Sequence, residues 1–160
     1  VMEPKFDWQL EFMDLYKEHV CERDLRTIHW FWDRDGGVGK TQLVKYLSVR
    51  HNVCFVSGSK RDIFFFITQY RKSNGTWPDA VIWYLARSAE STGNGDKVSW
   101  DAIESVKDGM FFSTKYESGA AVFNSPFVCI LANFPPSDTS VLSSDKWNIR
   151  EIDSQTKKFL

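Results

Sequence analysis

Residues 27–47 read TIHWFWDRDGGVGKTQLVKYL, and this stretch decides the fold. A β-rich apolar run, 27–32, leads into a glycine-rich turn and a Lys-Thr pair, and an amphipathic run, 42–47, follows. A strand, a glycine-rich turn, Lys-Thr and a helix form the layout of a phosphate-binding loop. Glycine lets backbone N–H groups turn toward a phosphate chain, and the start of the following helix adds partial positive charge. The sequence therefore predicts a nucleotide-phosphate site made by Gly36, Gly37, Val38, Gly39, Lys40 and Thr41.

Two side chains of this loop carry the predicted chemistry. Lys40 is expected to reach the β- and γ-phosphates of ATP, and the Thr41 hydroxyl to hold Mg²⁺. The loop departs from the full motif at one position, because Arg34 stands where the first glycine belongs. The alternative interpretation is an ordinary glycine-rich turn before a helix, with the Lys-Thr pair present by chance.

Composition narrows the class of protein. A chain of 160 residues with a formal net charge of −1 is long enough for one domain and has no overall basicity that would indicate nucleic acid. Its three cysteines are widely spaced, without zinc-site or disulfide spacing, which fits a reducing compartment. No apolar run approaches the ~20 residues that span a bilayer, so we expect no membrane partner. Val1 precedes Met2, which indicates a fragment of a longer protein.

Periodicity predicts strands alternating with helices. The expected helices cover 6–20, 41–50, 63–70 (with Asp62 as N-cap) and 100–107 (with Ser99 as N-cap). The expected strands cover 27–32, 53–56, 80–85, 127–131 and 147–152, and 111–112 and 121–123 are expected to be the arms of a hairpin or an extended loop. This order implies an α/β fold with a central, mostly parallel sheet flanked by helices. The glycine loop and the ends of strands 80–85 and 127–131 should then meet at one edge of the sheet.

Several further segments match one family in chain order. They are 81–88, 103–118, 123–126, 131–136 and 142–147. Together with the glycine loop they resemble the helicase domain of the replication-initiator (Rep) proteins of small circular single-stranded DNA viruses, a superfamily 3 member of the AAA+ ATPases. The resemblance covers about 8–152, and its most specific part is 103–118 followed by Asn133.

The resemblance implies roles for particular residues. Asn133 matches the polar sensor that contacts the γ-phosphate or the attacking water; the alternative is a turn asparagine before Phe134-Pro135-Pro136. Segment 107–116 matches a channel-facing loop, in which Lys107, Lys115 and Tyr116 would contact single-stranded DNA, and Phe112 could stack on bases. The alternative is a hairpin whose aromatic residues, Phe111 and Phe112, belong to the core. Arg87 matches a family arginine, with a surface charge as the alternative.

Two departures concern catalysis. Tyr84 stands at the acidic position of the Walker B motif, and a phenol carries no negative charge at neutral pH to orient a magnesium-bound water. Glu90 or Asp79 are candidate substitutes. Lys146 stands where relatives have an arginine that would act on a neighbouring subunit's nucleotide; lysine keeps the charge but lacks the bidentate fork, and Arg150 is an alternative.

These features imply an AAA+-like P-loop domain over 23–153, a short N-terminal helical segment over 1–22 that is a remnant of an oligomerisation collar, and a tail over 154–160. The leading interpretation is the ATP-dependent helicase motor of a viral replication initiator. It would act as a homo-hexamer on single-stranded DNA in the host nucleus, although this fragment alone could be monomeric. The alternative is an ATP-binding oligomerisation module with weak or no hydrolysis because of Tyr84. A small P-loop kinase is a third candidate, but the sequence shows no arginine-rich lid.

Overall fold

A computed structural model describes residues 1–85, 98–113, 119–137 and 144–160 of the chain. In chain order the helical elements are α1 (Asp7–Cys21), α2 (Lys40–Arg50), α3 (Lys60–Asn74), α5 (Trp100–Asp108) and the short 3-10 helix η1 (Ser144–Lys146). The strands are β1 (Ile28–Trp32), β2 (Val53–Val56), β3 (Ala80–Tyr84), β4 (Met110–Ser113), β5 (Gly119–Val122), β6 (Phe127–Ala132) and β7 (Trp147–Glu151).

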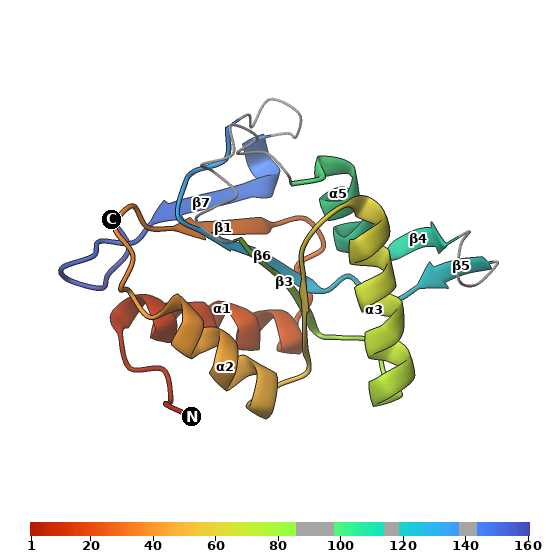
Figure 1. Ribbon diagram of the computed structural model, residues 1–160, viewed down its shortest axis with the longest axis horizontal. Coiled ribbons are helices and arrows are strands. Elements are labelled where there is room, and N and C mark those ends of the chain that lie inside the picture. The colour runs from red at the N-terminus through yellow and green to blue at the C-terminus, as the bar shows by residue number, and fades with distance from the viewer. Residues whose placement is uncertain (86–97, 114–118, 138–143) are drawn as a thin grey trace.

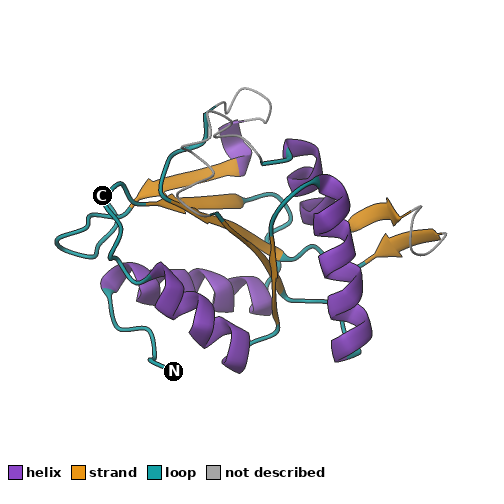
Figure 2. Ribbon diagram, in the orientation of Figure 1, coloured by secondary structure: helices purple, strands orange, loops and turns teal. Residues whose placement is uncertain are grey.

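Five of these strands form a single sheet in the order β2-β3-β6-β1-β7, and all of their pairings are parallel. Strands β1 and β6 are buried along their whole length, as expected when helices cover both faces of a parallel sheet. Helices α1 and α2 lie on one face, and α3 and α5 lie toward the other (Figures 1 and 2). The predicted α/β class with a central parallel sheet is therefore confirmed, and the fold is consistent with a P-loop domain.

Each face of the sheet has its own core. One core joins Trp8 and Phe12 of α1 with Leu43 and Leu47 of α2 and with sheet residues such as Phe31. The other joins α3, α5 and Phe111 of the hairpin with the opposite faces of the same strands. Helix α1 thus packs into the core of the sheet domain; a further role in oligomerisation stays a prediction.

Helix α3 begins earlier than the sequence analysis placed it. Its N-cap is Ser59, whose hydroxyl accepts a hydrogen bond from the Asp62 N–H, while the Asp62 carboxylate accepts one from the Ser59 N–H at 3.1 Å. The predicted N-cap role of Asp62 is therefore wrong, because Asp62 is the third residue of a capping box. The predicted cap at Ser99 is confirmed, since its hydroxyl accepts a hydrogen bond from the Ala102 N–H at 3.2 Å.

Strands β4 and β5 pair antiparallel as a separate two-stranded sheet that projects from the body beside α3 (Figure 1). This confirms the predicted hairpin. Within the described ranges, no helix has the length and apolar character needed to cross a membrane.

Candidate nucleotide-phosphate site

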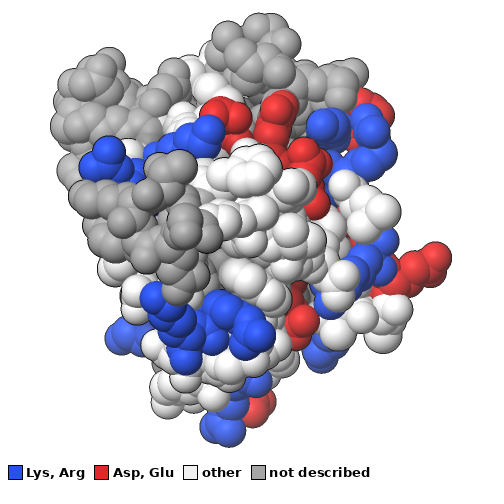
Figure 3. Space-filling model, turned by 90° about the vertical axis from the view of Figure 1, so that its right-hand side faces the viewer, with Lys and Arg blue, Asp and Glu red and all other residues white. Residues whose placement is uncertain are grey.

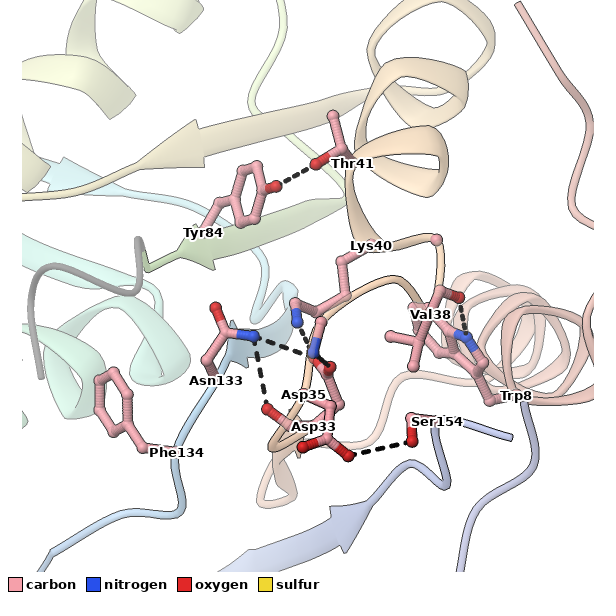
Figure 4. A network of polar contacts seen from close by, with 12 residues as sticks. Trp8, Asp33, Asp35, Val38, Lys40, Thr41, Tyr84, Asn133, Phe134 and Ser154 are labelled. Atoms are coloured by element: carbon pink, nitrogen blue, oxygen red, sulfur yellow. Dashed lines mark hydrogen bonds and ion pairs between the residues drawn. The ribbon is translucent and has the colours of Figure 1, made fainter. Parts of the chain in front are cut away.

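A cavity of about 440 Å³ opens at the carboxyl ends of the parallel strands. Its walls come from the loop after β1, from Tyr84 at the end of β3, and from Asn133 just after β6 (Figure 4). The predicted convergence of these three segments is confirmed. Its lining residues are Phe6, Gly36, Gly37, Val38, Gly39, Lys40, Thr41, Gln42, Tyr84 and Asn133.

The backbone of the loop explains its glycines. Gly36, Gly37 and Gly39 have φ values of 80°, 76° and 93°, a left-handed region that other residues rarely adopt. Helix α2 begins at Lys40 with Gly39 as its N-cap, so no side chain caps its first N–H groups, and its first turn contains no acidic residue. These groups therefore present an uncompensated positive helix end toward the cavity, an arrangement suited to a phosphate.

Helix α1 holds the outer side of this loop. The Trp8 indole N–H donates to the Val38 carbonyl at 2.8 Å, and the Gln9 amide donates to the Gly39 carbonyl at 2.9 Å. Both donors are almost fully buried. Fixing these two carbonyls on the α1 side fixes the peptide planes of the loop. The sequence analysis did not assign this support, because it depends on contacts 30 residues apart in the chain.

Asp33 is the central side chain of the site, and the sequence analysis missed it. It follows β1 directly and is fully buried. Its carboxylate pairs with the Lys40 ammonium, accepts from the Gly36 N–H, and accepts from the Asn133 amide at 3.2 Å (Figure 4). Lys40 itself is 7% exposed. Asp33 thus joins the loop lysine and the predicted sensor asparagine in one network.

Tyr84 occupies the position at which the Walker B acid was expected. Its hydroxyl hydrogen-bonds the Thr41 hydroxyl, the group predicted to hold Mg²⁺ (Figure 4). The end of β3 therefore lies beside the start of α2, and the equivalence of Tyr84 to the Walker B acid stays a prediction. The chemistry differs, because a phenol supplies neither a negative charge nor a general base at neutral pH.

The candidate substitutes for the missing acid do not fill the gap. Asp79 directly precedes β3, so it lies at the amino ends of the parallel strands, away from the glycine loop at their carboxyl ends. Its carboxylate is 3.6 Å from the Arg23 guanidinium. It cannot reach the loop, so that prediction is wrong. Glu90 lies outside the described residues, as does Arg87. Among the described residues of this cavity network, Asp33 is the carboxylate next to Lys40.

Of the three residues predicted to contact DNA (Lys107, Lys115 and Tyr116), the structure describes only Lys107. Lys115 and Tyr116 lie outside the described residues, in the part of the sequence between β4 and β5. Lys107 is only 4% exposed, and its ammonium donates to the Asp24 and Pro126 carbonyls at 2.7 and 2.9 Å. A buried lysine with two carbonyl partners cannot meet a phosphate backbone, so we assign Lys107 a structural role instead.

The hairpin separates its two phenylalanines. Phe111 is 3% exposed and its ring stacks on Phe64 at 4.1 Å, whereas Phe112 is 67% exposed. Phe111 therefore belongs to the core, and Phe112 remains accessible to a base. On the face shown in Figure 3, basic and acidic side chains lie near one another around a central uncharged area.

The predicted trans-acting cations lie away from this cavity. Lys146 is the last residue of η1 and directly precedes β7, so it lies at the amino ends of the parallel strands, away from the glycine loop. Arg150 pairs with Glu11 at 3.0 Å and lies 4.2 Å from the Phe159 ring centroid. Neither residue lines the cavity of its own chain, so a role for Lys146 on a neighbour's nucleotide stays a prediction.

A larger cavity, of about 560 Å³, lies at the amino ends of the parallel strands, and His19, His29 and Lys107 are among its lining residues. Burial lowers the pKa of His29 to about 4 and that of Lys107 to about 8. The part of the chain that the structure describes contains no cluster of three His, Cys, Asp or Glu side chains that could hold a metal ion.

Comparison with known proteins identifies homologues. The chain is 28% identical over 143 residues to the master replication protein of Subterranean clover stunt virus (strain F), covering 88% of this chain and 46% of that protein. It is 29% identical over 142 residues to the master replication protein of Faba bean necrotic yellows virus (isolate Syrian SV292-88), covering 87% of this chain and 45% of that protein. It is 31% identical over 142 residues to Para-Rep C6 of Subterranean clover stunt C6 alphasatellite, with the same coverage.

The homologues of this chain are thus viral replication proteins, which supports a role in DNA replication. The chain spans about half the length of the curated relatives it matches. No family model matches the chain, and no solved structure matches it with statistical significance.

Proposed function

We propose that this chain is the ATP-dependent DNA helicase motor domain of a viral replication protein, of the superfamily 3 type. The observation that carries the proposal is the loop itself. Three left-handed glycines lead into an uncapped helix whose first residues are Lys40 and Thr41, beside a cavity of about 440 Å³. That volume falls within the ~300–1,000 Å³ typical of small-ligand sites.

The proposed chemistry assigns each residue a step. The loop amides and Lys40 would bind the phosphates of ATP, and Thr41 would hold Mg²⁺ after releasing Tyr84. Asn133 would orient the γ-phosphate or its attacking water, since an amide both donates and accepts. Arg87 and Lys146 would contribute positive charge, the latter to the next subunit of a homo-hexamer. Lys115 and Tyr116 would contact single-stranded DNA.

The test of the site is nucleotide binding by calorimetry with Lys40→Ala. We expect Lys40→Ala to abolish binding of MgATP, because the phosphates lose their one loop side-chain cation. Lys45→Ala is the matched control, since Lys45 is exposed on the same helix. Circular dichroism must show that both variants are folded. Equal ATP affinity in Lys40→Ala and the parent would refute the assignment of the loop.

A second candidate function is favoured by Tyr84. An ATP-binding oligomerisation module would use nucleotide as a ligand that stabilises subunit packing, without turnover. Steady-state phosphate release in the presence of single-stranded DNA separates the two functions. Release no faster than that of Lys40→Ala, from a chain that binds ATP, favours the module. Tyr84→Asp should then raise the rate, because it puts a carboxylate at the end of β3, from which it could orient a water on Mg²⁺.

The DNA part of the proposal has its own test. Lys115→Ala should weaken binding of single-stranded DNA by the assembled protein and reduce the dependence of affinity on salt, because one phosphate contact is lost. Lys45→Ala again serves as the control. Unchanged affinity and salt slope would remove Lys115 from the DNA-contacting surface.

A further inference from the structure

One wall of the cavity at the glycine loop carries an aromatic side chain, which the binding of phosphates does not require. Phe6, just before α1, lines the cavity together with the polar loop, Lys40, Thr41 and Asn133. A phenyl ring offers no hydrogen bond to a phosphate. It does offer a flat apolar surface of the kind on which a nucleobase stacks.

The position of this ring is fixed against the loop. A Cβ placed on Gly39 would lie 3.2 Å from two carbon atoms of the Phe6 ring, so the ring packs directly on the last glycine before α2. The loop and the ring therefore form adjoining parts of one wall. A ligand whose phosphates lie on the loop has the Phe6 ring beside it.

Gln9 locks the two parts together. Its side-chain oxygen accepts hydrogen bonds from the Lys5 and Phe6 N–H groups at 3.0 and 3.1 Å, while its amide nitrogen donates to the Gly39 carbonyl. Gln9 is 1% exposed. One buried side chain thus sets the distance between the Phe6 backbone and the loop, and such preorganisation reduces the entropy that a ligand loses on binding.

The ring remains accessible to a ligand. Phe6 is only partly buried, and the exposed Lys5 ammonium lies 5.4 Å from its centroid. An exposed lysine can leave the ring without burying its charge. The other aromatic residue that lines the cavity, Tyr84, has its hydroxyl bonded to Thr41.

We infer that Phe6 is the stacking platform for the base of the bound nucleotide, and that Gln9 positions this platform against the loop. This inference rests on the proposed function, because it assumes that the loop holds the phosphates. It makes the start of α1 part of the ligand site rather than only a packing element.

The test compares two ligands that differ by the nucleoside. Calorimetry measures the affinity for MgATP and for magnesium tripolyphosphate in the parent chain, in Phe6→Ala and in Phe6→Trp. We expect Phe6→Ala to weaken ATP binding by about 5- to 100-fold, the loss of one base–aromatic stack, and to leave tripolyphosphate binding unchanged. Phe6→Trp should retain the ATP affinity. Leu10→Ala is the matched control, since Leu10 is an exposed apolar residue of α1 outside the cavity.

The possible results distinguish a failure of this inference from a failure of the proposed function. A parent chain that binds neither ligand refutes the proposed function and the inference together. A parent chain that binds both ligands equally keeps the phosphate site and overturns the platform. A parallel loss of both ligands in folded Phe6→Ala also overturns it, because Phe6 would then act only by supporting Gly39.

Discussion

The buried pair of Asp33 and Lys40 makes a quantitative prediction about stability and binding. Asp33 is fully buried and Lys40 is 7% exposed, so water screens the attraction between the two charges only weakly. Asp33→Asn removes the negative charge and keeps the shape. Removing one partner of a buried pair costs about 3–5 kcal/mol, because the remaining charge is left uncompensated. We expect the lower end, about 3 kcal/mol, since the asparagine oxygen still accepts from Gly36 or Lys40.

Urea unfolding followed by tryptophan fluorescence measures this loss, and the seven tryptophans of the chain provide the signal. A loss of 3 kcal/mol corresponds to a melting temperature lower by about 10 °C for a domain of this size. Asp35→Asn is the matched control, because Asp35 is an exposed acid of the same loop with one hydrogen bond, from Ser154 at 3.1 Å. Equal losses for the two variants would refute the argument that the buried pair stabilises the fold.

The same substitution should have the opposite effect on nucleotide binding. If the loop binds ATP as proposed, its phosphates would compete with Asp33 for Lys40 and would be repelled by the Asp33 carboxylate. Asp33→Asn removes both penalties, so we expect MgATP affinity to rise on the order of 10-fold, in line with ~1.5–3 kcal/mol for a hydrogen bond to a charged group. A fall in affinity would show that the Asp33 carboxylate assists the ligand, and would contradict the competition described here.

Three further predictions concern other contacts. Trp8→Phe should lower the free energy of unfolding by about 1 kcal/mol and weaken ATP binding, because the Val38 carbonyl loses its donor. Urea denaturation measures the first effect and calorimetry the second. An unchanged ATP affinity would argue against support of the loop by α1. Ser99→Ala should lower the free energy of unfolding by about 1 kcal/mol, because α5 loses its N-cap hydrogen bond. Thermal melting measures this loss, and an unchanged melting temperature would mean that the cap is dispensable. The neutral form of His29 is stabilising, because burial lowers its pKa from 6.5 to about 4. This contribution is fully present above pH 6.5 and is lost as the pH falls toward 4, by up to on the order of 3 kcal/mol, and His29→Gln should flatten that decline in urea titrations. An equally steep decline in the variant would assign it to other groups.

The sequence predicted those parts of the site that depend on local order. A strand, left-handed glycines and a helix start are encoded in consecutive residues, so the loop over 36–41 was predictable. Parallel strands then bring Tyr84 and Asn133 to the same edge, because the carboxyl ends of such strands coincide. The convergence of these strand ends needed only periodicity and topology, whereas the roles of Tyr84 and Asn133 came from the family resemblance.

The parts that were missed depend on side-chain contacts across the fold. Asp33 is one of two acids beside the glycines, and the local sequence does not show that Lys40 and Asn133 are its partners. Lys107 resembles a surface cation in the sequence, yet its stem lies in the core and its ammonium binds two carbonyls. The signal that could have found Asp33 is its place immediately after a strand that is apolar except for His29, since such a position lies at the carboxyl end of a buried strand.

Two side chains of the loop are already engaged by contacts within the chain. Lys40 is held by Asp33, and Thr41 is held by Tyr84, so both side chains that would meet MgATP already have internal partners. Under the proposed function, binding of MgATP would have to exchange both contacts, and the affinity would be the difference between the old and the new partners. Asp33 is a carboxylate held by Lys40 and Asn133, whereas Tyr84 offers Thr41 an uncharged hydroxyl. We therefore expect Asp33 to control the availability of Lys40 and Asn133, and Tyr84 that of Thr41.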